Sequence, residues 1–422
     1  MMDGCDGDGF LAAARASATA LREVLEPTPL QQNLMLSARY GAEVLLKRED
    51  LTPVRSYKLR GAFTFFRKAL AARPDARRFV CASAGNHAQG FAFACQHFGV
   101  DGVIYMPVTT PQQKIDKSRA FGAGRVEIKL IGDFFDRSAA AAREEAEQSG
   151  ATLVPPFDHP DVIEGQASVG LEIIEQTPGP IDLLILPVGG GGLSAGVCQV
   201  MRRLSPRTDI VFVEPAGAPS FKRSLEAGRR VRLDRVDSFV DGAAVAEIGA
   251  LNWDVLRDRR PEDVLLIPEN NLCETILEML NIEGIVLEPA GALEVDALRW
   301  IDPARLRGRR VVCVTSGGNF DFERLPEVKE RAMKAAGVKK YFVLRLPQRP
   351  GALRDFLGLL GPDDDIARFE YLKKSARNFG SILLGVETTR PENFKALLSS
   401  MDAAGLEYRD ITDDEVLTGV LV

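Results

Sequence analysis

Four consecutive glycines at residues 189–192 constrain the fold of this chain more than any other feature. They follow an apolar run at residues 181–186, which ends at Pro187 and predicts a buried strand. After the glycines, the segment from Leu193 to Leu204 has the apolar spacing of a helix. A glycine turn between a strand and a helix leaves backbone N–H groups free to bind an anion, and side chains would block the close approach. The segment therefore predicts a phosphate site, and a flexible surface linker is the alternative.

The glycines do not match the common nucleotide-binding motifs. A Walker loop needs Lys followed by Ser or Thr after its last glycine, whereas this chain has Leu193 and Ser194. A dinucleotide fingerprint needs spaced glycines near the chain start and an acidic residue about twenty residues later. Four adjacent glycines in mid-chain fit neither pattern. They favour the phosphate of a small cofactor.

A lysine in an apolar segment indicates the class of that cofactor. Lys58 is predicted near the start of a helix that runs through Phe63, Phe65 and Phe66 to Leu70. A charged lysine facing inward on such a helix is costly to bury, and the cost disappears when its amine forms an imine with an aldehyde cofactor. Taken alone, Lys58 is more easily explained as a solvated helix residue, so the other motifs decide its interpretation.

A second polar loop lies at residues 83–90, with the sequence Ser-Ala-Gly-Asn-His-Ala-Gln-Gly. It follows a predicted strand at residues 78–82 and precedes a predicted helix at residues 88–98. Small residues and an asparagine at a strand-to-helix turn predict a second anion site, suited to a carboxylate at a helix N-terminus. An ordinary helix N-cap by Ser83 or Asn86 is the alternative.

Taken together, these three motifs resemble the fold-type II family of pyridoxal-phosphate enzymes, and a fourth element matches as well: Thr315, Ser316, Gly317, Gly318 and Asn319. Among those enzymes the chain is most similar to the biosynthetic threonine dehydratases, from about Leu30 to the C-terminus. The resemblance implies two α/β domains with pyridoxal 5'-phosphate between them. It also implies dehydration and deamination of L-threonine to 2-oxobutanoate and ammonia, the first step of isoleucine biosynthesis.

The resemblance implies a role for each residue of the motifs. Lys58 would bind the cofactor as an imine and, once released, would remove the α-proton of the substrate. Asn86 would bond to the ring hydroxyl, and Ser316 would face the pyridine nitrogen. The backbone that holds the cofactor phosphate would come from Gly189, Gly190, Gly191, Gly192 and Leu193. The loop that takes the substrate carboxylate would be lined by Ser83, Gly85, Asn86 and His87.

Two of these positions bear on the type of reaction. Many pyridoxal-phosphate enzymes place a carboxylate at the pyridine nitrogen, whereas the neutral hydroxyl of Ser316 should leave that nitrogen largely unprotonated and favour prompt loss of a β leaving group. In the similar serine racemases a second serine stands in the place of Ala84, and an alanine cannot transfer a proton. The sequence therefore predicts β-elimination with little racemisation.

Composition limits the partners of the chain. A net charge of −6 gives no electrostatic reason to bind nucleic acid or an anionic membrane. The N-terminus is acidic and unlike a signal peptide, and no apolar run is long enough to span a bilayer. The six cysteines lack Cys-x-x-Cys spacing, and His97 and His159 lack ligand partners nearby. We therefore expect a cytoplasmic enzyme without a metal site.

Predicted strands and helices alternate over the first three-quarters of the chain, which is typical of open, mostly parallel sheets covered by helices. We expect a large cofactor-binding domain at residues 1–52 and 154–322 and a small catalytic domain at residues 53–153. After a linker at residues 323–338, residues 339–422 predict a single β-α-β-β-α-β unit, an α+β module similar to the ACT-like regulatory modules of the short threonine dehydratases. The resemblance implies isoleucine as inhibitor, valine as a candidate opposing effector, and a homo-oligomer, namely a tetramer. An oligomerisation appendage without a ligand is the alternative for this module.

Other functions remain open from the sequence. A degradative serine/threonine dehydratase would share the catalytic motifs, although the C-terminal module favours the biosynthetic enzyme. Threonine synthase, cysteine synthase and diaminopropionate ammonia-lyase use the same cofactor on other substrates. A non-catalytic amino-acid sensor could keep the same fold, but both Lys58 and the glycine turn are present here, which favours an enzyme.

Overall fold

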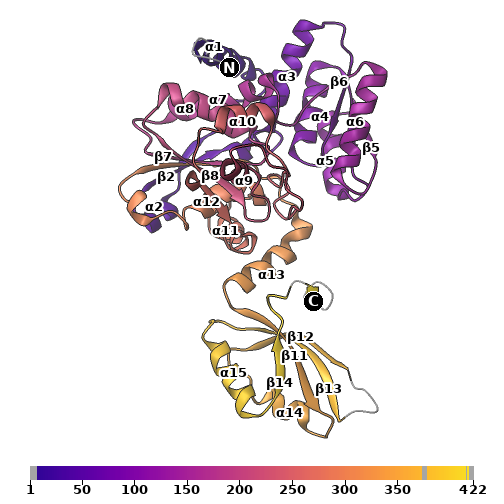
Figure 1. Cartoon of the computed structure of the whole chain (residues 1–422), viewed down its shortest axis with the longest axis vertical. Helices are drawn as coiled ribbons and strands as arrows, with labels where there is room; N and C mark the ends of the chain where they lie inside the picture. Colours follow the sequence, from indigo (N-terminus) through magenta and orange to yellow (C-terminus); the bar gives the residue numbers. More distant parts are fainter. Residues whose placement is uncertain (1–6, 373–377, 415, 418–422) are drawn as a thin grey trace. The chain divides into compact units, whose positions relative to one another are not determined.

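The computed structural model describes residues 7–372, 378–414 and 416–417, and the chain divides into two compact units between Phe322 and Glu323 (Figure 1). The first unit holds a six-stranded and a four-stranded sheet, and the second unit holds one four-stranded sheet. The predicted fold class, α/β followed by an α+β unit, is confirmed. No helix in the described ranges is long and apolar enough to cross a membrane.

The large sheet of the first unit has the strand order β1-β2-β10-β7-β8-β9. Its neighbours are parallel except for the edge pair β1 and β2. Every residue of β7 is buried, as expected for a central strand that helices cover on both faces. In sheet order the strands are β1 (Leu30–Gln32), β2 (Glu43–Arg48), β10 (Arg310–Thr315), β7 (Leu183–Pro187), β8 (Asp209–Pro215) and β9 (Val264–Ile267).

The smaller sheet of the first unit is parallel throughout, with the order β5-β4-β3-β6. Its own core contains the stacked rings of Phe66 and Phe79. In sheet order its strands are β5 (Val126–Leu130), β4 (Asp101–Met106), β3 (Arg78–Ala82) and β6 (Thr152–Leu153). The helices around it in Figure 1 are α3 (Lys58–Ala72), α4 (Asn86–Phe98), α5 (Gln112–Gly122) and α6 (Phe135–Ser149).

The remaining helices of the first unit are α1 (Gly7–Leu21), α2 (Leu34–Tyr40), α7 (Pro160–Gln176), α8 (Gly192–Leu204), α9 (Ser220–Ala227), α10 (Ala250–Leu256), α11 (Glu269–Asn281) and α12 (Pro289–Ala297). The sequence predicted α3, α4 and α8 to within a few residues. It did not predict the short strands β1 and β6, because two or three residues carry too little periodicity to be recognised.

The second unit has an antiparallel sheet of order β12-β13-β11-β14. The predicted β-α-β-β-α-β order is confirmed. The segment expected as a linker contains α13. In chain order the elements are α13 (Leu325–Ala335), β11 (Lys339–Pro347), α14 (Ala352–Leu357), β12 (Asp365–Leu372), β13 (Phe379–Glu387), α15 (Asn393–Ala403) and β14 (Glu407–Asp410).

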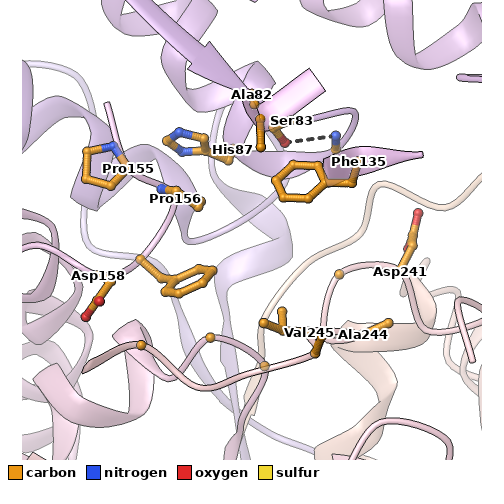
Figure 2. A pocket seen from close by; sticks show the side chains of 18 of the residues that line it. Ala82, Ser83, His87, Phe135, Pro155, Pro156, Asp158, Asp241, Ala244 and Val245 are labelled. Carbon is orange, nitrogen blue, oxygen red and sulfur yellow. Dashed lines mark hydrogen bonds between the residues drawn. The ribbon is translucent and has the colours of Figure 1, made fainter. Parts of the chain in front are cut away.

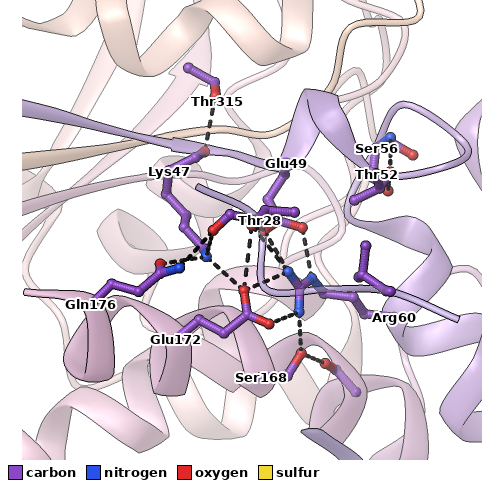
Figure 3. Close-up of polar contacts among 12 residues, drawn as sticks. Thr28, Lys47, Glu49, Thr52, Ser56, Arg60, Ser168, Glu172, Gln176 and Thr315 are labelled. Atoms are coloured by element: carbon purple, nitrogen blue, oxygen red, sulfur yellow. Dashed lines mark hydrogen bonds and ion pairs between the residues drawn. The ribbon is translucent and has the colours of Figure 1, made fainter. Parts of the chain in front are cut away.

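A buried cluster of charges fixes the start of α3 in the first unit (Figure 3). Arg60 is fully buried and donates to Glu49 at 2.7 Å and to Glu172, on α7, at 2.8 Å. Lys47, on β2, also donates to Glu172, at 2.6 Å. Burial alone would raise the pKa of Glu172, but the two cations outweigh it and hold that pKa below its ordinary value. We call these four residues the Arg60 cluster; it ties α3 to β2 and α7.

Replacing Arg60 with methionine should destabilise the protein strongly, because the substitution leaves the carboxylates of Glu49 and Glu172 buried, and the remaining cations, Lys47 and Arg22, pair only with Glu172. We expect a loss of about 3–5 kcal/mol in the free energy of unfolding, measured from urea denaturation. Arg119→Met, which removes an exposed ion pair with Asp116, is the control and should cost less than about 0.5 kcal/mol. An Arg60→Met protein as stable as the control would contradict this account.

Candidate active site

A cavity of about 970 Å³ lies in the first unit. Its walls come from the residues that follow β3, β6 and β7, from the starts of α3 and α6, and from the segment between α9 and α10. Figure 2 shows His87, Pro155 and Pro156 on one side of the cavity and Asp241, Ala244 and Val245 on another. The carboxyl ends of parallel strands from both sheets thus meet at one place, which is where α/β proteins bind their ligands.

Most of the site residues predicted from the sequence line this cavity, namely Lys58, Ser83, Gly85, Asn86, His87, Gly189, Gly190 and Gly191. Three others are not among its lining residues in the described part of the chain: Gly192, Leu193 and Ser316. Gly192 and Leu193 form the first turn of α8, directly behind the glycine turn. The backbone oxygen of Ser316 accepts from the N–H of Tyr57 at 3.2 Å. This hydrogen bond holds the Ser316 backbone beside the residue that precedes Lys58.

The glycine turn can only be built from glycine. Gly191 has φ of +89°, in the left-handed region that favours glycine. A Cβ atom on Gly190 would collide with the ring of Phe157, and one on Gly189 would lie 2.9 Å from the Cα of Ala243. No side chain among the described residues caps the N-terminus of α8, so its first N–H groups can bind an anion. The turn therefore fits the predicted phosphate.

The amine of Lys58 lies in the same cavity as the turn. Lys58 is the first residue of α3, and its Nζ donates to the backbone oxygen of Pro156 at 3.0 Å. Nζ lies 5.8 Å from the centroid of the Phe157 ring, the ring that packs against Gly190. Burial lowers the pKa of Lys58 to about 8, against an opposing attraction from Glu288. At pH 7 roughly a tenth of the amine is thus neutral, and therefore nucleophilic, far more than for a lysine with its ordinary pKa.

The asparagine loop begins α4, and its side chains do not act as an ordinary cap. The N-cap residue is Gly85, and within the described chain no side chain bonds to the first turn of α4. Ser83 Oγ instead accepts from the N–H of Gly85 at 3.1 Å. His87 Nε2 lies 3.0 Å from the backbone oxygen of Val154. Burial, and then the charge of Lys58, lower the pKa of His87 to about 3, so its ring is neutral at physiological pH.

Among the lining residues to which the sequence assigned no role, three lie around the predicted site residues: Phe157, Glu288 and Asn319. Glu288 precedes α12 and accepts from Asn86 Nδ2 at 2.5 Å, while Asn319 Nδ2 donates to Asn86 Oδ1 at 2.8 Å. Burial, and then the charge of Asp241, raise the pKa of Glu288 to about 7. Asn319 stands in the motif that begins at Thr315 and could have been noticed there. Glu288 and Phe157 carry no local signal.

A second, smaller cavity, of about 390 Å³, lies in the second unit. It combines apolar side chains with two arginines, a composition suited to a small ligand that has an apolar part and a carboxylate. Leu346 and Ile382 are buried in its walls, and Leu357 is 43% exposed. The lining residues are Leu346, Arg349, Gly351, Ala352, Leu353, Arg354, Leu357, Tyr371 and Ile382.

Comparison with known proteins gives matches over nearly the whole chain. Residues 21–317 match the family model described as pyridoxal-phosphate dependent enzyme, and residues 330–421 match that of the C-terminal regulatory domain of threonine dehydratase. A protein of Bacillus subtilis described as biosynthetic L-threonine dehydratase IlvA is 45% identical over 95% of this chain and 95% of its own. Its counterpart in Halalkalibacterium halodurans is 43% identical over 95% of this chain and 96% of its own.

Solved structures agree with these matches. The processed form of threonine deaminase isoform 2 from Solanum lycopersicum has 36% identity and a TM-score of 0.72, covering 78% of this chain and 94% of that chain. Maize serine racemase has 26% identity and a TM-score of 0.69, covering 77% of this chain and 98% of that chain. The matches confirm the expected fold and cofactor class, and this chain belongs to the pyridoxal-phosphate dependent enzymes and, among them, to the family of the biosynthetic threonine dehydratases.

Proposed function

We propose that this protein dehydrates and deaminates L-threonine to 2-oxobutanoate and ammonia, as the first step of isoleucine biosynthesis. The observation that carries the proposal is that the Lys58 amine, the asparagine loop and the glycine turn line one cavity. The similar proteins described as biosynthetic L-threonine dehydratase support the choice of substrate and pathway.

The residues of the cavity fit pyridoxal 5'-phosphate. The glycine turn, with Gly192 and Leu193 behind it, would hold the phosphate at the N-terminus of α8. Lys58 would hold the aldehyde carbon, Asn86 the ring hydroxyl and Ser316 the ring nitrogen. When bound, this cofactor withdraws electrons from the α-carbon of the substrate and so acidifies its α-proton.

The chain's own groups would then act on the substrate. Ser83 and the uncapped N–H groups at the start of α4 would bind the substrate carboxylate, which sets the direction of the α-proton. The neutral amine of Lys58 would take that proton at Nζ. Ala84 offers no group that could return a proton from another direction, and His87 is neutral and bonded to Val154. We therefore propose elimination with little racemisation.

We also propose the predicted division into a large and a small domain, with the small domain closing over the substrate. All four strands of the small sheet fall within residues 53–153. Two ion pairs link this segment to the loop before α10: Lys114 with Asp241, and Arg232 with Asp136 at 3.3 Å. All four side chains line the cavity, so these pairs would favour the closed form.

Lys58→Ala should abolish keto-acid formation from L-threonine, because it removes both the attachment point of the cofactor and the base. We expect the rate to fall by about 10³-fold or more, measured by assay of 2-oxobutanoate. The wild-type protein should be coloured, and borohydride should fix the cofactor to Lys58. A colourless wild-type protein that borohydride does not label would favour a sensor. Substantial formation of D-allothreonine from L-threonine, or of D-serine from L-serine, would refute elimination with little racemisation.

The rate at which the apoenzyme takes up pyridoxal 5'-phosphate should rise with pH and level off above about 8. The reason is that only the neutral amine attacks an aldehyde, and burial lowers the pKa of Lys58 from 10.5 to about 8. Stopped-flow absorbance of the bound cofactor would measure this rate. A rate that keeps rising up to pH 10 would show that the amine is solvated.

We propose that the cavity of the second unit binds isoleucine as a feedback inhibitor, with valine as a candidate opposing effector. Its leucines and Ile382 suit a branched aliphatic side chain, and Arg349 and Arg354 suit the carboxylate. Binding there would shift a two-state equilibrium between more and less active forms.

Leu357→Glu should desensitise the enzyme to isoleucine, because it places a carboxylate in the apolar wall of this cavity. We expect the isoleucine concentration for half-inhibition to rise about tenfold or more while activity without isoleucine is unchanged. Phe379→Glu is the matched control, since Phe379 is 44% exposed and Leu357 is 43% exposed, and Phe379 does not line the cavity. If isoleucine has no effect on the wild-type enzyme, a degradative serine/threonine dehydratase becomes the better assignment.

A further inference from the structure

The amide of Asn86 is held from both sides in this structure. Its Nδ2 donates to Glu288 Oε1 at 2.5 Å, and its Oδ1 accepts from Asn319 Nδ2 at 2.8 Å. The partners come from segments far away in the sequence, because Glu288 precedes α12 and Asn319 follows β10. Glu288 is 5% exposed. Its N–H donates to the backbone oxygen of Gly317 at 3.2 Å, so the Glu288 backbone is anchored next to the segment that carries Asn319.

The direction of the Asn86 amide follows from its partners. Asn319 Nδ2 also donates to the backbone oxygen of Val54, at 2.8 Å, and a carbonyl can only accept. Asn319 must therefore present N–H groups, and Asn86 must present its oxygen to Asn319. A flipped Asn86 amide would place its oxygen against the carboxylate of Glu288 and its N–H groups against those of Asn319. The contact with Asn319 would then be unfavourable by about one lost hydrogen bond, and so would the contact with Glu288 whenever its carboxyl is ionised.

One hydrogen on Asn86 Nδ2 remains after the bond to Glu288. We propose that Glu288 and Asn319 are positioning residues, which orient Asn86 so that this N–H, and never the amide oxygen, points at the ring oxygen of the cofactor. The inference rests on the proposed contact between Asn86 and the ring hydroxyl. A fixed donor at that oxygen favours its ionised form, whereas an amide oxygen in the same place would disfavour it.

The orientation can be tested without catalysis, by titrating apoenzyme variants with pyridoxal 5'-phosphate and recording the affinity and the absorption spectrum. Glu288→Leu and Asn319→Leu should each weaken cofactor binding about tenfold and change the visible band, because the ring oxygen loses its oriented donor. Glu288→Gln keeps an acceptor for Asn86 and should restore both values to nearly those of the wild type. Either leucine variant with wild-type affinity and spectrum would overturn the proposal.

A matched control separates orientation from general damage to the fold. Glu294 lies on α12, is fully buried, and neither of its carboxyl oxygens has a hydrogen bond within the described residues. It does not line the cavity, so Glu294→Leu should leave the cofactor affinity and spectrum unchanged. If Glu294→Leu had the same effect as Glu288→Leu, the effect would come from loss of a buried carboxyl and not from orientation.

Coupling to Asn86 distinguishes this inference from the proposed function. Asn86→Ala should weaken cofactor binding, and adding Glu288→Leu to it should cost nothing more, because Glu288 acts through Asn86. If Asn86→Ala alone leaves binding and spectrum unchanged, the proposed role of Asn86 fails. If Asn86→Ala has its effect but Glu288→Leu weakens binding by the same factor in both backgrounds, the role of Asn86 stands and the positioning role of Glu288 fails.

Discussion

Burial of one amine at the start of α3 is the constraint on which the site depends. Lys58 must be out of water for its amine to be neutral, and it must stay in place. The backbone holds it on one side, where the N–H of Tyr57 donates to the oxygen of Ser316. On the other side, Arg60 bonds to Glu49 and Glu172, and the Arg60 cluster so formed joins α3 to β2 and α7. The reactive group thus stands between two anchors that belong to the large sheet and its helices.

The second requirement is close approach, and glycine supplies it. Phe157 packs directly on Gly190, and the Lys58 amine lies within reach of the same ring. A side chain on the turn would push Phe157 away and widen the distance between the amine and the N-terminus of α8. The absence of side chains at residues 189–192 therefore determines how closely the amine and the N-terminus of α8 can approach. The residues that follow β3 and β7, which belong to different sheets, form walls of the site.

The parts of the site that the sequence predicted are those with a local signal. The glycine turn, Lys58 and the asparagine loop each lie at a strand end or helix start, where composition and periodicity change within a few residues. Glu288 and Phe157 lack such a signal, because their roles depend on contacts with residues far away in the sequence, Asn86 and Gly190. The Arg60 cluster was equally hidden: Arg60 and Glu172 are 112 residues apart, and each looks like a solvated charge in its own helix. The expected linker was rich in charge, yet α13 forms there because its alanines, lysines and glutamates are good helix formers.

The electrostatics of the cavity explain why a helix terminus suits this site. Burial lowers the pKa values of Lys58 and His87 and raises that of Glu288, so all three groups are driven toward their neutral forms. The negative charge of a phosphate would by itself favour the protonated form of the Lys58 amine. The N–H groups of α8 bind an anion through their dipoles and carry no net charge. The positive end of the α8 dipole offsets part of the phosphate's charge, so phosphate binding and a neutral, reactive amine can coexist in one cavity.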